Sequence, residues 1–92
     1  MATLFAMPKL GMNQEDGLLT RWIVAEGAEV TAGQPILEIE TDKAIVDLEA
    51  PASGILARIV HREGETIPIN GVLAVILDPG EAMPDEVPDT IA

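Results

Sequence analysis

The chain has 92 residues with a formal net charge of −11, and it contains no cysteine. Its length allows one small domain with a thin core, and the lack of cysteine excludes disulfides and thiolate metal sites. Sixteen acids against five Lys and Arg exclude a nucleic-acid binder, which needs cations to replace the counterions of phosphate, and an anionic membrane surface would repel the chain as well.

Two stretches of the chain resemble each other, residues 17–27 and residues 54–64. At a constant offset, five residues of the first stretch fall on the same residue types in the second: Gly17, Leu19, Arg21, Glu26 and Gly27 on Gly54, Leu56, Arg58, Glu63 and Gly64. Each repeat is typical of a strand, a Glu-Gly turn, a short strand and a second strand. Neither half can bury an apolar face alone, so the sequence predicts two halves that face each other as a sandwich or flattened barrel.

Three segments carry the strand pattern most clearly: 18–24, 35–40 and 44–49. The first is rich in apolar and β-prone residues between two glycines, and in the other two apolar and acidic residues alternate. No segment has an apolar stripe of helical period with caps. We therefore expect an all-β protein with almost no helix.

Residues 80–92 differ in character from the rest. Prolines alternate there with acidic residues, which denies a sheet its N–H donors and adds repulsion between like charges. The sequence predicts that this segment is a disordered linker or tail. A linker would indicate a longer protein, whereas a short free-standing protein could also end in such a tail.

Lys43 lies in the run "ILEIETDKAIVDLEA", between two segments with strand pattern, and Lys9 is the only other lysine. The apolar residues of the two strands share a face in either of two registers, with the turn at Thr41–Asp42 or at Asp42–Lys43. Both registers put Lys43 at or beside the tip of a hairpin, directed away from the core. Taken alone, such a residue is most simply a solvated turn lysine. A Schiff-base lysine is disfavoured, because such lysines need desolvation or a cationic neighbour, whereas here Glu40 and Asp42 are adjacent.

The motif Glu40-Thr41-Asp42-Lys43-Ala44 resembles the attachment hairpin of lipoyl domains, in which the lysine carries lipoic acid in amide linkage. The resemblance covers roughly residues 3–79, and includes "MPKLG", "VTAGQP" and "PASG" around the hairpin. It implies two four-stranded antiparallel sheets related by a pseudo-twofold axis, with the domain at 1–79. It also implies lipoate on Lys43, recognised together with its flanks Glu40, Thr41, Asp42 and Ala44. The domain itself would be a carrier with no catalytic residues and no metal.

The same resemblance implies the partners of a dihydrolipoamide acyltransferase in a 2-oxoacid dehydrogenase complex. These are a thiamine-diphosphate-dependent decarboxylase, a dihydrolipoamide dehydrogenase, the acyltransferase core, and a lipoate ligase or lipoyl transferase. Pyruvate, branched-chain and acetoin-type complexes are favoured over the 2-oxoglutarate type. The loop expected beside the arm, in contact with the decarboxylase, consists of Leu10, Gly11, Met12, Asn13, Gln14, Glu15 and Asp16. The first residues contain neither a basic region nor a long apolar segment, so we expect a cytoplasmic protein, most simply a bacterial one. We also expect the isolated domain to be monomeric.

Three rival functions remain open. A biotin carrier domain shares the fold, but its lysine usually lies between two methionines, whereas Asp42 and Ala44 flank Lys43. The lipoylated H protein of glycine cleavage is longer and has helical segments. A binding module without a cofactor would use the hairpin only for docking. Catalysis by the chain itself has little support, since His61 and Ser53 are the only residues of their kinds and no cysteine is present.

Overall fold

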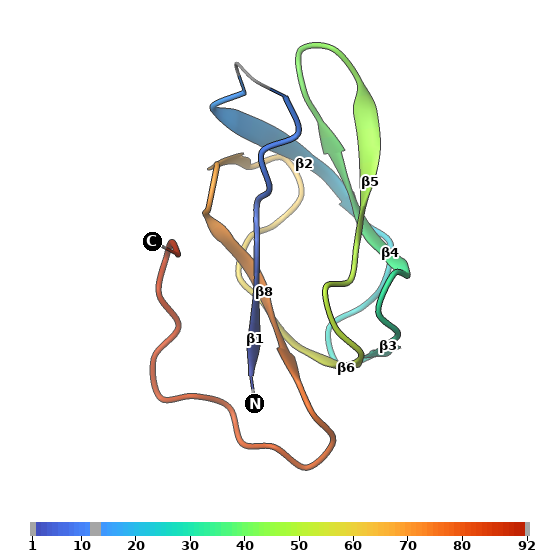
Figure 1. Ribbon diagram of the computed structural model, residues 1–92, viewed down its shortest axis with the longest axis vertical. Coiled ribbons are helices and arrows are strands. Elements are labelled where there is room, and N and C mark those ends of the chain that lie inside the picture. Colours follow the sequence, from blue (N-terminus) through green and yellow to red (C-terminus); the bar gives the residue numbers. More distant parts are fainter. Residues whose placement is uncertain (1, 12–13, 92) are drawn as a thin grey trace.

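The computed structural model describes residues 2–11 and 14–91, and these residues form eight strands in two antiparallel sheets (Figure 1). The strands are β1 (Thr3–Ala6), β2 (Asp16–Trp22), β3 (Glu29–Val30), β4 (Pro35–Glu40), β5 (Ile45–Glu49), β6 (Gly54–Ile59), β7 (Thr66–Pro68) and β8 (Val72–Leu77). The described residues form no helix, so none there is long and apolar enough to cross a membrane. The expected all-β fold of two four-stranded sheets is confirmed.

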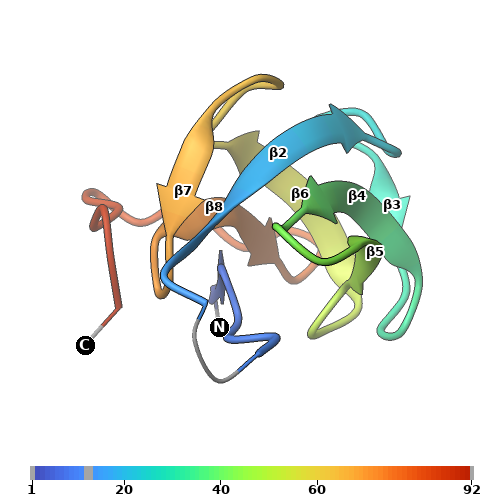
Figure 2. The ribbon, with the colours of Figure 1, turned by 90° about the horizontal axis from the view of Figure 1, so that it is seen from above.

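The order of strands is β1-β8-β6-β3 in one sheet and β5-β4-β2-β7 in the other. Each position in the first order has its counterpart in the second, with β6 matching β2 and β8 matching β4. Seen from above, the two sheets curve around a shared interior (Figure 2). The topology therefore has the twofold relationship that the sequence repeat predicts.

The two Glu-Gly turns make this relationship visible at atomic detail. Gly27 and Gly64 both have φ of 92°, a region that favours glycine. The N–H of Gly27 donates to the carbonyl of Leu56 at 2.7 Å, and the N–H of Gly64 donates to the carbonyl of Leu19 at 2.7 Å. Each half thus closes its turn on the central strand of the other half.

The glutamate of each turn also accepts a hydrogen bond from the other half of the domain. The N–H of Trp22 donates to Glu63 Oε2 at 2.9 Å, and the N–H of Ile59 donates to Glu26 Oε1 at 2.7 Å. Each carboxylate thus accepts a hydrogen bond from the last backbone N–H of β2 or β6. β2 ends at Trp22, whereas the apolar pattern had predicted a strand continuing to Val24, although the N–H of Ile23 still donates to the carbonyl of Ile36 at 2.9 Å.

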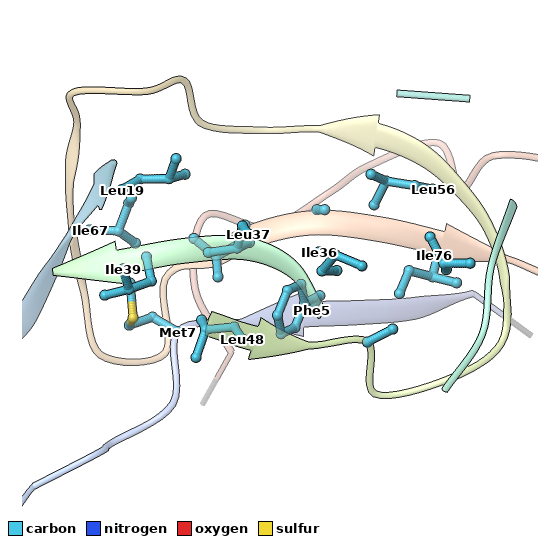
Figure 3. Packing of buried hydrophobic residues seen from close by; sticks show 14 residues of the cluster. Phe5, Met7, Leu19, Ile36, Leu37, Ile39, Leu48, Leu56, Ile67 and Ile76 are labelled. Carbon is cyan, nitrogen blue, oxygen red and sulfur yellow. The ribbon is translucent and has the colours of Figure 1, made fainter. Parts of the chain in front are cut away.

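The core lies between the two sheets and is built almost entirely from aliphatic side chains (Figure 3). β8 is buried along its whole length, whereas β4 alternates between core and outer face after Leu37. Leu37, Ile39 and Leu48 are buried as the alternation predicts, and Val46 is half-buried against them. Trp22 packs against the edge of this cluster, with its indole N–H donating to the carbonyl of His61 at 2.9 Å.

The segment after β8 returns to the domain near its end (Figure 1). The N–H of Val72 donates to the carbonyl of Asp89 at 2.8 Å, the N–H of Ile91 donates to that of Asn70 at 2.9 Å, and Thr90 forms a bridge with Gly71. Nothing in the sequence indicated this return. The disorder expected of residues 80–92 concerns motion, and it stays a prediction.

Candidate functional site

The lysine hairpin joins β4 to β5, and its register is the one with the turn at Asp42–Lys43. Glu40 pairs with Ile45 and Ile39 with Val46, so Thr41 and Ala44 are the last residues to face each other before the turn. The sequence had left this register open. Lys43 is therefore the second of the two central residues of the turn. The hairpin that joins β4 to β5 extends to the end of the molecule away from β3 (Figure 1).

Thr41 holds the tip of the hairpin together. Its N–H and its hydroxyl donate to the carbonyl of Ala44 at 2.8 and 3.1 Å. Its hydroxyl oxygen in turn accepts from the N–H groups of Lys43 and Ala44 at 3.3 and 3.2 Å. A threonine side chain that bonds nearby backbone groups is a recurrent way of stabilising a turn. The backbone of Lys43 is thereby fixed while its side chain is left exposed.

Lys43 can take a covalent acyl group without disturbing the fold. Lys43, Asp42 and Ala44 are all exposed, and a side chain at a turn is not packed in the core. The residues present therefore fit a carboxylic acid joined to the lysine as an amide.

The loop that follows β1 lies beside the hairpin, as expected for the predicted partner loop. Leu10, Gly11 and Gln14 line one side of a hollow of about 160 Å³, and residues 41–44 with Val46 line the other. Of the seven residues assigned to this loop, Met12 and Asn13 lie outside the described residues. The structure thus brings Leu10, Gly11 and Gln14 of the predicted contact loop next to the lysine.

A second, more polar hollow of about 390 Å³ lies next to the hairpin. Four carboxylates line it, those of Glu15, Asp16, Glu40 and Asp42. The two predicted groups of site residues, from the loop and from the hairpin, therefore meet at one negatively charged surface. In the part of the chain that the structure describes, no group of three or more potential ligands is arranged to hold a metal ion.

Two residues at this surface were missed by sequence reasoning. Leu18 and Thr66 line the acidic hollow from β2 and β7. They are paired across the two strands, which requires knowing that β7 lies beside β2. The carboxylate of Glu38, on the outer face of β4, accepts a hydrogen bond from Thr20 Oγ1 at 2.7 Å and forms an ion pair with Arg21 at 3.5 Å.

Comparison with known proteins agrees with this architecture. The family model described as "biotin-requiring enzyme", which covers biotin and lipoyl attachment domains, matches residues 3–76. The chain is 41% identical over 86 residues to the dihydrolipoyllysine-residue acetyltransferase component of the acetoin cleaving system of Cupriavidus necator, covering 94% of this chain and 23% of that protein. It is also 41% identical over 80 residues to the corresponding component of the pyruvate dehydrogenase complex of Rickettsia typhi, covering 86% of this chain and 20% of that protein.

Two solved structures show the same fold. The lipoyl domain of the 2-oxoglutarate dehydrogenase complex from Azotobacter vinelandii matches with a TM-score of 0.65 at 27% identity, covering 83% of this chain and 98% of that one. Urea carboxylase from Kluyveromyces lactis matches with a TM-score of 0.70 at 26% identity, covering 84% of this chain and 6% of that one. The chain thus spans less than a quarter of the length of the curated relatives described above. Both curated relatives described above are dihydrolipoyllysine-residue acetyltransferase components. Because the family model matches residues 3–76, the chain belongs to the biotin–lipoyl attachment family.

Proposed function

We propose that this chain is a carrier domain that holds lipoate in amide linkage on Lys43. The observation that carries the proposal is the hairpin tip, where Thr41 fixes the backbone of Lys43 and leaves its amine exposed. A lipoyl group supplies a disulfide–dithiol pair that accepts and releases acyl groups and electrons. The domain contributes the attachment point and the surfaces by which other proteins recognise it.

The benefit of such a carrier is effective concentration. A group tethered to a domain that can reach several active sites meets each of them in an intramolecular step, at concentrations of the order of millimolar for short flexible tethers. The exposed tip keeps the arm accessible, and the Pro-rich acidic segment after residue 79 is suited to act as a linker. We accordingly assign the carrier domain to residues 1–79 and the linker to residues 80–92.

The partners follow from the same proposal. The domain would serve a 2-oxoacid dehydrogenase complex, receiving acyl groups from a thiamine-diphosphate-dependent decarboxylase. It would deliver them to an acyltransferase core and be reoxidised by dihydrolipoamide dehydrogenase, after a lipoate ligase or lipoyl transferase has modified Lys43. The two relatives from an acetoin cleaving system and from a pyruvate dehydrogenase complex favour complexes of those types. A bacterial cytoplasm is the compartment in which we expect such a complex.

The second candidate is a biotin carrier domain. The fold does not separate the two functions, because a urea carboxylase shares it. The residues beside the lysine favour lipoate, since Asp42 and Ala44 stand where biotin carriers usually have methionines.

The test compares two modifying enzymes in separate reactions, each followed by intact-mass measurement. The chain is incubated with a lipoate ligase and lipoate in one reaction and with a biotin ligase and biotin in the other. We expect one lipoyl group per chain in the first reaction and little biotin in the second. Efficient biotinylation, or no lipoyl adduct, would overturn the proposal. Lys43→Arg should abolish the adduct, whereas Lys9→Arg should leave it intact.

A further inference from the structure

The hollow between the loop after β1 and the lysine hairpin has mostly apolar walls. Leu10 lies on one side of it, and Ala44 and Val46 lie on the other, with Lys43 also lining it. The loop and the hairpin come from distant parts of the sequence, and both lie at the same end of the molecule (Figure 1). The attachment residue thus opens directly onto an apolar depression of about 160 Å³.

Hydrogen bonds hold Leu10 at this position. The backbone N–H of Leu10 donates to Gln14 Oε1 at 2.6 Å, and the side-chain nitrogen Nε2 of Gln14 donates to the carbonyl of Asp16 at 3.1 Å. The backbone N–H of Gln14 donates to the carbonyl of Gly11 at 3.2 Å. The side chain of Gln14 therefore ties the loop to the start of β2. Leu10 nevertheless remains 46% exposed, so its side chain still has apolar surface to cover.

We propose that this hollow is a resting seat for the aliphatic chain of the lipoyl arm on Lys43. The inference rests on the proposed function, because the arm must be present to occupy the seat. Lys43 itself lines the hollow, so an arm that starts there reaches the walls directly, and its chain of methylene groups matches the apolar surface of Leu10, Ala44 and Val46. Each methylene that is fully buried favours the seated state by roughly fourfold. The arm of the free domain would therefore spend much of its time against Leu10 and Val46.

The other exposed aliphatic residue near the lysine does not offer such a seat. Ile45 is 59% exposed and is only two residues from Lys43. It neighbours Val46 on β5, and successive side chains of a strand point to opposite faces, so Ile45 faces away from the hollow. Ile45 and Leu10 are thus a matched pair of exposed apolar residues of which only Leu10 lines the seat.

A seated arm would link the contact loop to the reactivity of the carrier. Any partner that binds Leu10 competes with the arm for the same apolar surface. Its docking would displace the arm toward the partner's own active site. The loop would then act both as a recognition surface and as the device that releases the arm.

The experiment uses the lipoylated domain made with lipoate labelled with ¹³C in the methylene chain. Intact mass is measured first, so that complete loading is established before the arm is examined. NMR then gives the NOEs between arm methylenes and protein methyl groups, together with ¹³C relaxation of the arm. The wild type is compared with Leu10→Ser and Ile45→Ser, both at exposed positions, and the core methyl spectrum reports whether each variant is folded.

We expect NOEs from the arm to Leu10 and Val46 in the wild type and in Ile45→Ser. In Leu10→Ser the NOEs to Val46 should weaken severalfold, and the arm should become more mobile. A loaded wild-type domain without such NOEs would overturn the seat and leave the proposed function standing. NOEs that vanish on dilution would show contact with a second copy and would also overturn it. A domain that accepts no lipoyl group would overturn both proposals.

Discussion

The N–H and the hydroxyl of Thr41 both donate to the carbonyl of Ala44, at 2.8 and 3.1 Å, across the turn that carries Lys43. The two residues close the hairpin so that the lysine backbone is held between them. A modifying enzyme that identifies one lysine by its position would need this geometry. The spacing of the motif Glu40-Thr41-Asp42-Lys43-Ala44 is thereby explained by the turn it builds.

Replacing the hydroxyl of Thr41 should therefore impair modification. Thr41→Val removes the acceptor for the N–H groups of Lys43 and Ala44, at a cost of about 1 kcal/mol for each net hydrogen bond lost. We expect kcat/KM of lipoate ligase for the domain to fall severalfold. Thr41→Ser keeps the hydroxyl and should retain most of the wild-type value. Equal rates for the valine variant and the wild type would mean that Thr41 does not position the lysine.

Much of this fold was predictable from the sequence because its two halves repeat. Glycines and glutamates in register predicted two equivalent turns, and the alternation of apolar and acidic residues predicted the buried faces of β4 and β5. The hairpin register was not predictable, since shifting the turn by one residue keeps the same side chains on the same face. In the structure the hydroxyl of Thr41 bonds the backbone of Lys43 and Ala44 across this turn, a contact that the apolar pattern does not specify.

The surroundings of the lysine were less accessible to sequence reasoning. The loop from Leu10 to Asp16 has no periodic pattern, so its position beside the hairpin was expected only through the family resemblance. Leu18 and Thr66 reach the acidic hollow only because β7 pairs with β2. Such pairings join residues far apart in the chain, and no local pattern specifies them.

The close approach of β6 to β8 makes Gly54 sensitive to substitution. A Cβ at Gly54 would collide with the carbonyl oxygen of Leu77 and lie 3.1 Å from Ile76 Cγ2, and the residue has φ of 155°. We expect Gly54→Ala to lower the free energy of unfolding by about 1–3 kcal/mol. Urea denaturation followed by circular dichroism measures this. Gly11→Ala is the control, since a Cβ there meets nothing within 4 Å, and its effect should stay within about 0.5 kcal/mol.

The turn at residues 61–65 should make a small contribution to stability that depends on pH. Glu65 Oε1 lies 2.9 Å from His61 Nδ1, and Glu65 Oε2 accepts from the N–H of Arg62 at 2.6 Å. These hydrogen bonds, first that from His61, lower the pKa of Glu65 below its usual value of 4.5. A carboxylate with a lowered pKa stabilises the folded state above its unfolded pKa, and this stabilisation is lost as pH falls through its folded pKa.

Glu65→Gln removes the titrating group, so its stability should change less than that of the wild type when pH falls from about 6 to about 3. Thermal denaturation at several pH values gives the comparison. Identical pH profiles for the two proteins would show that the His61–Glu65 contact does not contribute in solution.

The acidic surface beside the lysine should determine how fast a basic partner associates. Replacing Glu15 and Asp16 by Gln and Asn removes two of the four carboxylates that line the hollow. We expect slower reductive acylation by the cognate decarboxylase, with a larger effect at low salt than at 0.15 M, where screening acts over about 8 Å. Lipoylation of Lys43 should stay unchanged, which separates partner recognition from modification. Acylation rates that respond neither to these charges nor to salt would place the recognition surface elsewhere.

The central claim is that Lys43 is the attachment point, and peptide mapping of protein from its native cells tests it most directly. The protein is isolated, reduced, alkylated and digested, and tandem mass spectrometry locates every modified residue. We predict a lipoyl group on the peptide that contains Lys43, and an unmodified Lys9. A lipoyl group on Lys9, biotin on Lys43, or an unmodified Lys43 in protein from cells that lipoylate other carriers would contradict the account.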